Sequence, residues 1–300
     1  MTEPSEKEIF AKEEVENTIL KIPIIRYLVI IPKKIKLPRF EGLSLWDLIY
    51  TYVFGIIEGT FSSRAGSIAF SFFMALFPFL LFLLNLIPYL PIEPYHFIAF
   101  VEDILPPHTN EYFLPVIKDI SENPRGGLIS FVFILTIFLM TNGVNAIFSG
   151  FEYSYHIKIN RTFFKQYFAA LAVSILLALL LLLSIILLVY SEQYFGSIRA
   201  VRVSIFIILI YFVIAILYYF GIKEGKKFKF FSIGAFVTML SYILTTYLFG
   251  VYINNFSNYN ELYGSIGAIL IMMLYIWINS NLLLLGFELN ATLQSLRNQK

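Results

Sequence analysis

Residues 166–191 read QYFAALAVSILLALLLLLSIILLVYS, a run of 26 residues without a lysine, arginine, aspartate or glutamate. A helix rises about 1.5 Å per residue and the hydrocarbon core of a bilayer is about 30 Å thick, so roughly 20 apolar residues are enough to cross it. Five more stretches meet this test: 65–92, 126–151, 203–222, 230–260 and 262–287. The sequence therefore predicts a polytopic membrane protein.

The lipid environment of the spans determines the fold class. Backbone N–H and C=O groups find no partners in lipid, so each span must be a helix or a strand of a closed barrel, and continuous apolar runs exclude the alternating pattern of barrel strands. We expect an all-α fold, a six-helix bundle in a membrane domain of residues 44–291. Residues 1–43 and 292–300 are predicted tails. The predicted spans are 65–90, 128–150, 167–190, 203–222, 232–253 and 264–287, with an outer loop at 91–127.

Basic residues predict the orientation. They gather before the first span and in the second and fourth gaps between spans, whereas the first gap is acidic and the fifth holds no basic residue. Lysine and arginine favour the cytoplasmic side, so both termini are predicted to be cytoplasmic. Residues 44–61 repeat apolar positions at helical spacing with Asp47 and Glu58 off the stripe, which is typical of an amphipathic helix on the inner surface.

Signatures of enzymes are missing from the sequence. There is no cysteine, and the histidines His96, His108 and His156 all fall outside the predicted spans. A metal-dependent nuclease needs clustered carboxylates or histidines, and nucleic-acid binding needs a dense patch of basic and aromatic residues. We expect no catalytic residue, no metal, no cofactor and no nucleic-acid partner.

Several segments, in order along the chain, resemble one known family. They are RAGSIAFSFFMALFP at 64–78, GLIS at 127–130, NGVNAIF at 142–148, YGSIGA at 263–268 and GFELNA at 286–291. Together they resemble the YihY/BrkB family of bacterial inner-membrane proteins, some of which were once labelled ribonuclease BN. Ser71 stands where a tyrosine is usual in that family, and Ala75 lies near a usual serine.

The resemblance implies a six-helix bundle located in the bacterial inner membrane. It implies little about activity, because the family has no generally accepted biochemical function, although a transport role has been suspected for it.

Polar residues inside the first two spans are the first candidates for a functional groove. Ser71, Pro78 and Asn85 recur every seven residues and share one face, either as a packing kink or as a bend that lines a substrate path. In the second span, Asn142, Asn145 and Ser149 share a face. They either form hydrogen bonds between helices or line a polar cavity.

The last two spans complete the candidate groove. Thr245 reaches a depth similar to that of Asn142 and Asn279, which makes a shared polar zone in mid-membrane geometrically feasible. Asn281 and Glu288 lie on one face of the last span. Glu288 either marks a proton or ion path or extends to water at the end of the helix.

Two functions remain open. The first is a transporter or flippase-like protein that moves a small molecule or lipid along the groove. The second is a scaffold that organises envelope proteins or lipids without transport. Membrane lipids are expected partners in either case.

The loop charges yield a topology prediction. Reporter domains fused after residues 120, 195 and 257 should report an external location, and fusions after 160, 227 and 300 a cytoplasmic one. Enzymatic reporters active on one side only provide the measurement, and a reversed signal at any position would contradict six spans with both ends inside.

Overall fold

We describe the fold from a computed structural model. It describes residues 27–36, 44–58, 61–86, 115, 129–152, 154, 162–195, 199–222, 229–255 and 265–298. The predicted outer loop at 91–127, except residue 115, and most of the predicted tail at 1–43 lie outside these residues. Within them, the one β-pairing is an isolated bridge between Lys36 and Ser44.

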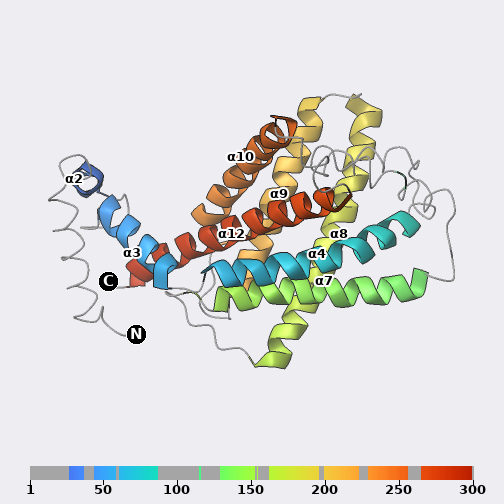
Figure 1. The fold of residues 1–300 in the computed structure, drawn as a ribbon, viewed down its shortest axis with the longest axis horizontal. Coiled ribbons are helices and arrows are strands. Elements are labelled where there is room, and N and C mark those ends of the chain that lie inside the picture. The colour runs from blue at the N-terminus through green and yellow to red at the C-terminus, as the bar shows by residue number, and fades with distance from the viewer. Residues whose placement is uncertain are drawn as a thin grey trace.

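Two short and six long helices make up the described chain (Figure 1). The short ones are α2 (Tyr27–Lys34) and α3 (Leu45–Glu58). The long ones are α4 (Phe61–Leu86), α7 (Ile129–Glu152), α8 (Phe163–Phe195), α9 (Arg199–Gly221), α10 (Ile233–Asn255) and α12 (Ser265–Asn298). Each long helix is apolar and long enough to cross a membrane, which confirms the predicted all-α class. α12 continues helically through residues 292–298.

The long helices pack as a closed ring. α4 lies beside α7, α7 beside α8, α8 beside α9, α9 beside α10, α10 beside α12, and α12 again beside α4. Figure 1 shows α4, α7 and α12 running side by side, with α8 crossing α7 steeply. Successive long helices of the described chain are therefore neighbours in space, and α12 closes the ring on α4.

The buried apolar core gathers at one end of this ring. The starts of α4, α8 and α10 contribute Ala65, Ile68, Ala170, Val173 and Ala235. The later parts of α7, α9 and α12 contribute the remaining large side chains, among them Phe148, Phe151, Tyr218, Leu284 and Phe287. The core thus contains the N-terminal parts of α4, α8 and α10 and the C-terminal parts of α7, α9 and α12. This is expected when successive spans cross the membrane in opposite directions.

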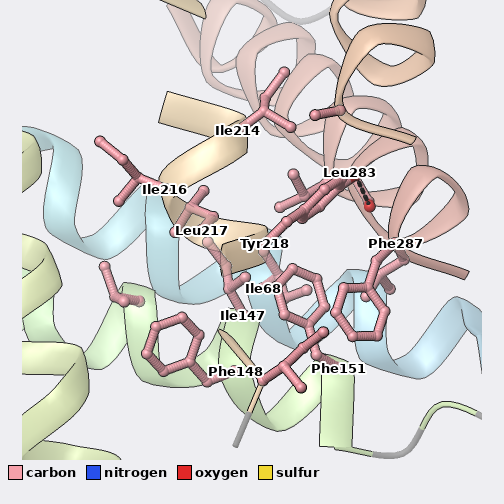
Figure 2. Close-up of a cluster of buried hydrophobic side chains, with 14 of the residues drawn as sticks. Ile68, Ile147, Phe148, Phe151, Ile214, Ile216, Leu217, Tyr218, Leu283 and Phe287 are labelled. Carbon is pink, nitrogen blue, oxygen red and sulfur yellow. Dashed lines mark hydrogen bonds between the residues drawn. The ribbon is translucent and has the colours of Figure 1, made fainter. Parts of the chain in front are cut away.

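Three aromatic rings form the centre of the core (Figure 2). Phe151 of α7 and Phe287 of α12 stack with their centroids 3.9 Å apart and their planes within 2° of parallel. Tyr218 of α9 packs edge-on against both rings, at 5.7 and 5.8 Å. Its hydroxyl donates to the Leu283 carbonyl at 2.7 Å, drawn as a dashed line in Figure 2. The buried hydroxyl of Tyr218 therefore has a hydrogen-bond partner, which offsets the cost of removing it from water.

Two glycines let α10 and α12 touch through their backbones. A Cβ atom on Gly286 would lie 2.6 Å from the Tyr218 hydroxyl and 2.9 Å from the Gly234 carbonyl, and would also collide with Thr238. A Cβ on Gly234 would collide with the Gly286 carbonyl and lie 2.6 Å from Cγ of Asn290. Small residues at helix crossings are typical of membrane bundles, and here no larger residue fits.

α3 is a separate helix that docks on α12. Ser44 and Asp47 form a reciprocal cap at its start, with the Ser44 N–H and hydroxyl each 2.7 Å from Oδ2 of Asp47. The Tyr52 hydroxyl donates to the Leu285 carbonyl of α12 at 3.1 Å, and Trp46 is buried. The predicted position of residues 44–61 on the inner membrane surface stays a prediction.

The glycine crossing gives a matched pair of variants. Gly286→Ala should lower the thermal midpoint in detergent, because overpacking at a rigid contact costs about 1–3 kcal/mol. Gly66→Ala is the control, since a Cβ there meets nothing within 4 Å and alanine favours a helix by about 1 kcal/mol. Equal midpoints for the two variants would contradict the close crossing.

Candidate functional site

One face of α7 changes from apolar to polar along its length. Residues 131, 134, 138, 142, 145 and 149 are spaced by three or four and therefore share this face. Its first half is strongly exposed and apolar: Phe131, Ile134 and Phe138 are 67%, 68% and 51% exposed. Large apolar side chains so exposed on a membrane span form a surface suited to contact with lipid. The second half, on the same side of the helix, consists of the half-buried Asn142, Asn145 and Ser149.

The start of α8 completes this polar patch. Nε2 of Gln166 donates to Oδ1 of Asn145 at 3.1 Å and to Oγ of Ser149 at 2.9 Å. The Tyr167 hydroxyl donates to Oδ1 of Asn142 at 3.4 Å, a long bond. We call Asn142, Asn145, Ser149, Gln166 and Tyr167 the polar face. A further hydroxyl pair, Thr141 and Ser174, lies 3.2 Å apart between the same helices.

The polar face extends well into the span. Asn142 lies ten residues before the end of α7 at Glu152, which corresponds to about 15 Å along the helix. Polar side chains in membrane spans usually turn toward the bundle interior. Asn142 and Asn145 lie half-buried where α7 meets α8, and each accepts a hydrogen bond from α8.

The candidates in α4 contact α7 through backbone atoms. The Thr136 hydroxyl donates to the Pro78 carbonyl at 2.8 Å, so the proline segment is tied to α7. Ser71 is half-buried, and its carbonyl lies 3.9 Å from the Cβ that Gly143 would carry. Asn85 falls in α4, but its side chain lies outside the described part of the structure.

The candidates in α10 and α12 belong to a different helix pair. The Tyr242 hydroxyl donates to the Asn279 carbonyl at 3.0 Å, while Nδ2 of Asn279 and of Asn281 bond carbonyls of their own helix. Thr245 is half-buried beside Thr246, which bonds Tyr275 at 2.7 Å. These bonds join α10 to α12, whereas those of Asn142 and Asn145 join α7 to α8. A zone shared by all of them stays a prediction.

Glu288 is buried at the end of the ring where the core lies. It is 1% exposed, and its Oε2 accepts a hydrogen bond from the Ser154 hydroxyl at 2.8 Å. Arg64, at the start of α4, interacts with Glu288 electrostatically and donates to the Gly150 carbonyl at 2.8 Å. Gly150 is in the last turn of α7, whose carbonyl groups favour a cation. Arg64 therefore bonds the last turn of α7, and Glu288 bonds Ser154 just beyond it.

The charge of Glu288 also affects Tyr52 in α3. Burial, followed by the charge of Glu288, raises the pKa of the Tyr52 phenol to about 12. Tyr52 therefore stays protonated at physiological pH and remains able to donate to α12.

Sequence reasoning missed part of this site. In the sequence, Gln166 and Tyr167 stand at the beginning of an apolar span, and Ser154 lies outside every span. Arg64 carried a usable signal, because a cation at the first turn of a membrane helix needs a partner. The GFELNA segment at 286–291 predicts no contact from its sequence alone. Its residues prove to be packed: Asn290 accepts the Gly234 N–H at 2.8 Å, and Ala291 is fully buried.

With six apolar helices in one ring, the chain is a multi-pass membrane protein. It belongs to the Virulence factor BrkB family, whose model matches residues 56–300, and the resemblance drawn from the sequence motifs is thereby confirmed.

Individual relatives agree with this assignment. The ribonuclease-like protein YfkH of Bacillus subtilis (strain 168) is 27% identical over 245 residues, 77% of this chain and 89% of that protein. A UPF0761 membrane protein of Psychrobacter sp. (strain PRwf-1) is 34% identical over 77 residues, 26% of this chain and 14% of its own. One of Idiomarina loihiensis is 26% identical over 112 residues, 37% and 39% of the two chains. No solved structure matches significantly.

The described residues contain no group of three or more histidine, aspartate or glutamate side chains that could hold a metal ion. The chemistry available at the polar face is therefore that of amide and hydroxyl groups, which bind by hydrogen bonding.

The buried charges give a test of the site at Glu288. Glu288→Leu should lower the thermal midpoint in detergent, since it leaves the buried Arg64 without the opposite charge with which it interacts, and an uncompensated buried charge costs about 3–5 kcal/mol. Glu288→Gln should cost less because it still accepts from Ser154.

The double variant Arg64→Leu with Glu288→Leu should regain part of the loss, because no buried charge is left uncompensated. Glu152→Gln at the end of α7 is the matched control and should change little. A double variant no more stable than Glu288→Leu alone would contradict an electrostatic pairing.

Proposed function

We propose that this protein is a transporter or flippase-like protein that moves a small polar molecule or a lipid along the polar face of α7 and α8. The observation that carries the proposal is the change of character on one face of α7. A membrane-facing helix surface that is apolar at Phe131 and Ile134 becomes a row of amides and a hydroxyl at Asn142, Asn145 and Ser149.

A packing role alone accounts poorly for this arrangement. Hydrogen bonds between membrane helices are worth about 0.6–2 kcal/mol each, and the Gln166 amide suffices to link α7 and α8. The two half-buried asparagines use only their Oδ1 atoms in these links, at 3.1 Å from Gln166 and at a long 3.4 Å from Tyr167. Their NH₂ groups form no bond within the described part of the chain. They do offer a polar route for a headgroup or solute past the apolar part of the membrane.

The proposal includes a cellular location and an orientation of the chain in the membrane. The loop charges and the family support the bacterial cytoplasmic membrane, with both termini in the cytoplasm. In that orientation the core end of the ring, where α7 ends and α8 begins, is the cytoplasmic end. The polar face then opens toward the inner leaflet.

We propose transport rather than enzymatic catalysis, although the relative from Bacillus subtilis bears a ribonuclease-like name. Metal-dependent hydrolysis of a phosphodiester relies on carboxylates or imidazoles that hold cations. The polar face offers carboxamides and hydroxyls instead, which suit recognition without bond cleavage.

The test compares the wild type with the double variant Asn142→Leu and Asn145→Leu in liposomes. Leucine is favourable in lipid, so insertion and thermal midpoint should change by no more than the loss of about two weak hydrogen bonds. Movement of fluorescent phospholipids and of small solutes across the bilayer should fall to the level of protein-free liposomes.

Ser204→Leu is the control for adding leucine to a span, because Ser204 is exposed on α9 and bonds only the Ala200 carbonyl of its own helix. Equal transport by wild type and double variant would refute a path along the polar face. Absence of transport by the wild type across the whole panel would instead favour a non-transporting scaffold.

A further inference from the structure

The short helices α2 and α3 form a small unit outside the ring. Figure 1 shows α3 leading away from the end of α12, with α2 at its far end, and the two short helices contact each other. A bridge between Lys36 and Ser44 joins them, and the Leu45 N–H donates to the Ile35 carbonyl at 2.8 Å. Because only residues 59 and 60 separate α3 from the span α4, the unit lies close to the membrane.

One side of α2 packs on the protein and the other faces outward. Val29 is fully buried, whereas Ile31 and Ile35 are 56% and 48% exposed. Ile35 continues the last turn of the helix, since its N–H donates to the Pro32 carbonyl at 3.2 Å. Lys34 is exposed as well. Spacings of three and four residues from Ile31 put Lys34 and Ile35 on its side of the helix, away from Val29.

The charge around the outward side is mainly positive. Lys33, Lys34 and Lys36 are all exposed, and the sequence from 17 to 40 holds six basic residues and no acidic one. Charges act in physiological salt over a Debye length of about 8 Å, and Lys33 and Lys36 lie within two residues of Lys34. Across the bridge, Asp47 brings one opposite charge, which the cap with Ser44 engages.

Exposed isoleucines beside lysines suit the interface of an anionic membrane. The apolar side chains enter the headgroup region, and the ammonium groups are attracted to the negative surface. The position of the unit favours a membrane over an acidic protein as the partner. It is attached to the spans α4 and α12, so lipid is always beside it, whereas a soluble partner has to be recruited.

We infer that the outward side of α2, with Ile31, Lys34 and Ile35, binds anionic lipid of the inner leaflet and anchors α2 and α3 on the membrane surface. The leaflet follows from the proposed orientation, in which the start of α4 is cytoplasmic. This contact is separate from the polar face of α7 and α8 and needs no transport, so it goes beyond the proposed function.

The experiment measures which lipid lies against α2. The chain has no cysteine, so Ile35→Cys carries a single bimane label in the full-length protein. The labelled protein is reconstituted in phosphatidylcholine that contains phosphatidylglycerol or phosphatidylcholine with brominated acyl chains. Bromine quenches the label on contact, and the two quenching curves give the relative association constant of the anionic lipid. It should exceed that of phosphatidylcholine at least fivefold, since each lysine at the surface contributes roughly that factor.

Lys34→Gln combined with Lys36→Gln should lower this preference at least about fivefold, and the corresponding pair of arginine substitutions should retain it. Both side chains are exposed, so the thermal midpoint should not change. The matched control combines Lys165→Gln with Lys229→Gln, which removes two exposed lysines near the starts of α8 and α10. It should leave the preference unchanged. Salt at about 1 M, where the Debye length is about 3 Å, should weaken it.

Equal quenching by the two brominated lipids would overturn the inference. An unchanged preference after loss of Lys34 and Lys36, or an equal loss in the control, would do the same. Absence of quenching by either lipid would overturn it in favour of an acidic partner outside the membrane. None of these results bears on transport along α7 and α8, because the lipid contact is measured without a transported substrate.

Discussion

The backbone contact between α10 and α12 at Gly234 and Gly286 is the constraint on which the rest of the bundle depends. Because the helices touch there, the side chain of Asn290 reaches the first turn of α10 and accepts the Gly234 N–H. The Tyr218 hydroxyl reaches the Leu283 carbonyl and Thr238 in the same region. One close approach therefore fixes the relative position of three helices, and the Phe151–Phe287 stack joins α7 to them.

The apolar lengths of the spans were sufficient to predict the number and type of the long helices. Length and the absence of charge are enough because lipid leaves no alternative to an internally hydrogen-bonded backbone. The order of neighbours in the ring could not be obtained in this way. It depends on contacts such as those of Gly234 with Asn290, which join residues far apart in the chain and leave no periodic signal.

The candidate site was predicted in part. The spacing of Asn142, Asn145 and Ser149 placed them on one face, but hydropathy alone does not tell whether that face points to lipid or to the core. The exposure of Phe131 and Ile134 on the same face decides it. Gln166 escaped notice because one amide at the start of a long apolar run hardly alters its hydropathy. Arg64 and Glu288 are separated by most of the chain, so their pairing required the fold.

The polar half of α7 also shortens the apolar band that this side of the protein presents to the membrane. From Ile129 to Thr141 the helix offers thirteen residues, about 20 Å at 1.5 Å per residue, against a hydrocarbon thickness of about 30 Å. A bilayer relieves such hydrophobic mismatch by thinning locally or by admitting water and headgroups, at fractions of a kcal/mol per Å. Lipids next to α7 would therefore meet a thinner barrier than those elsewhere around the ring.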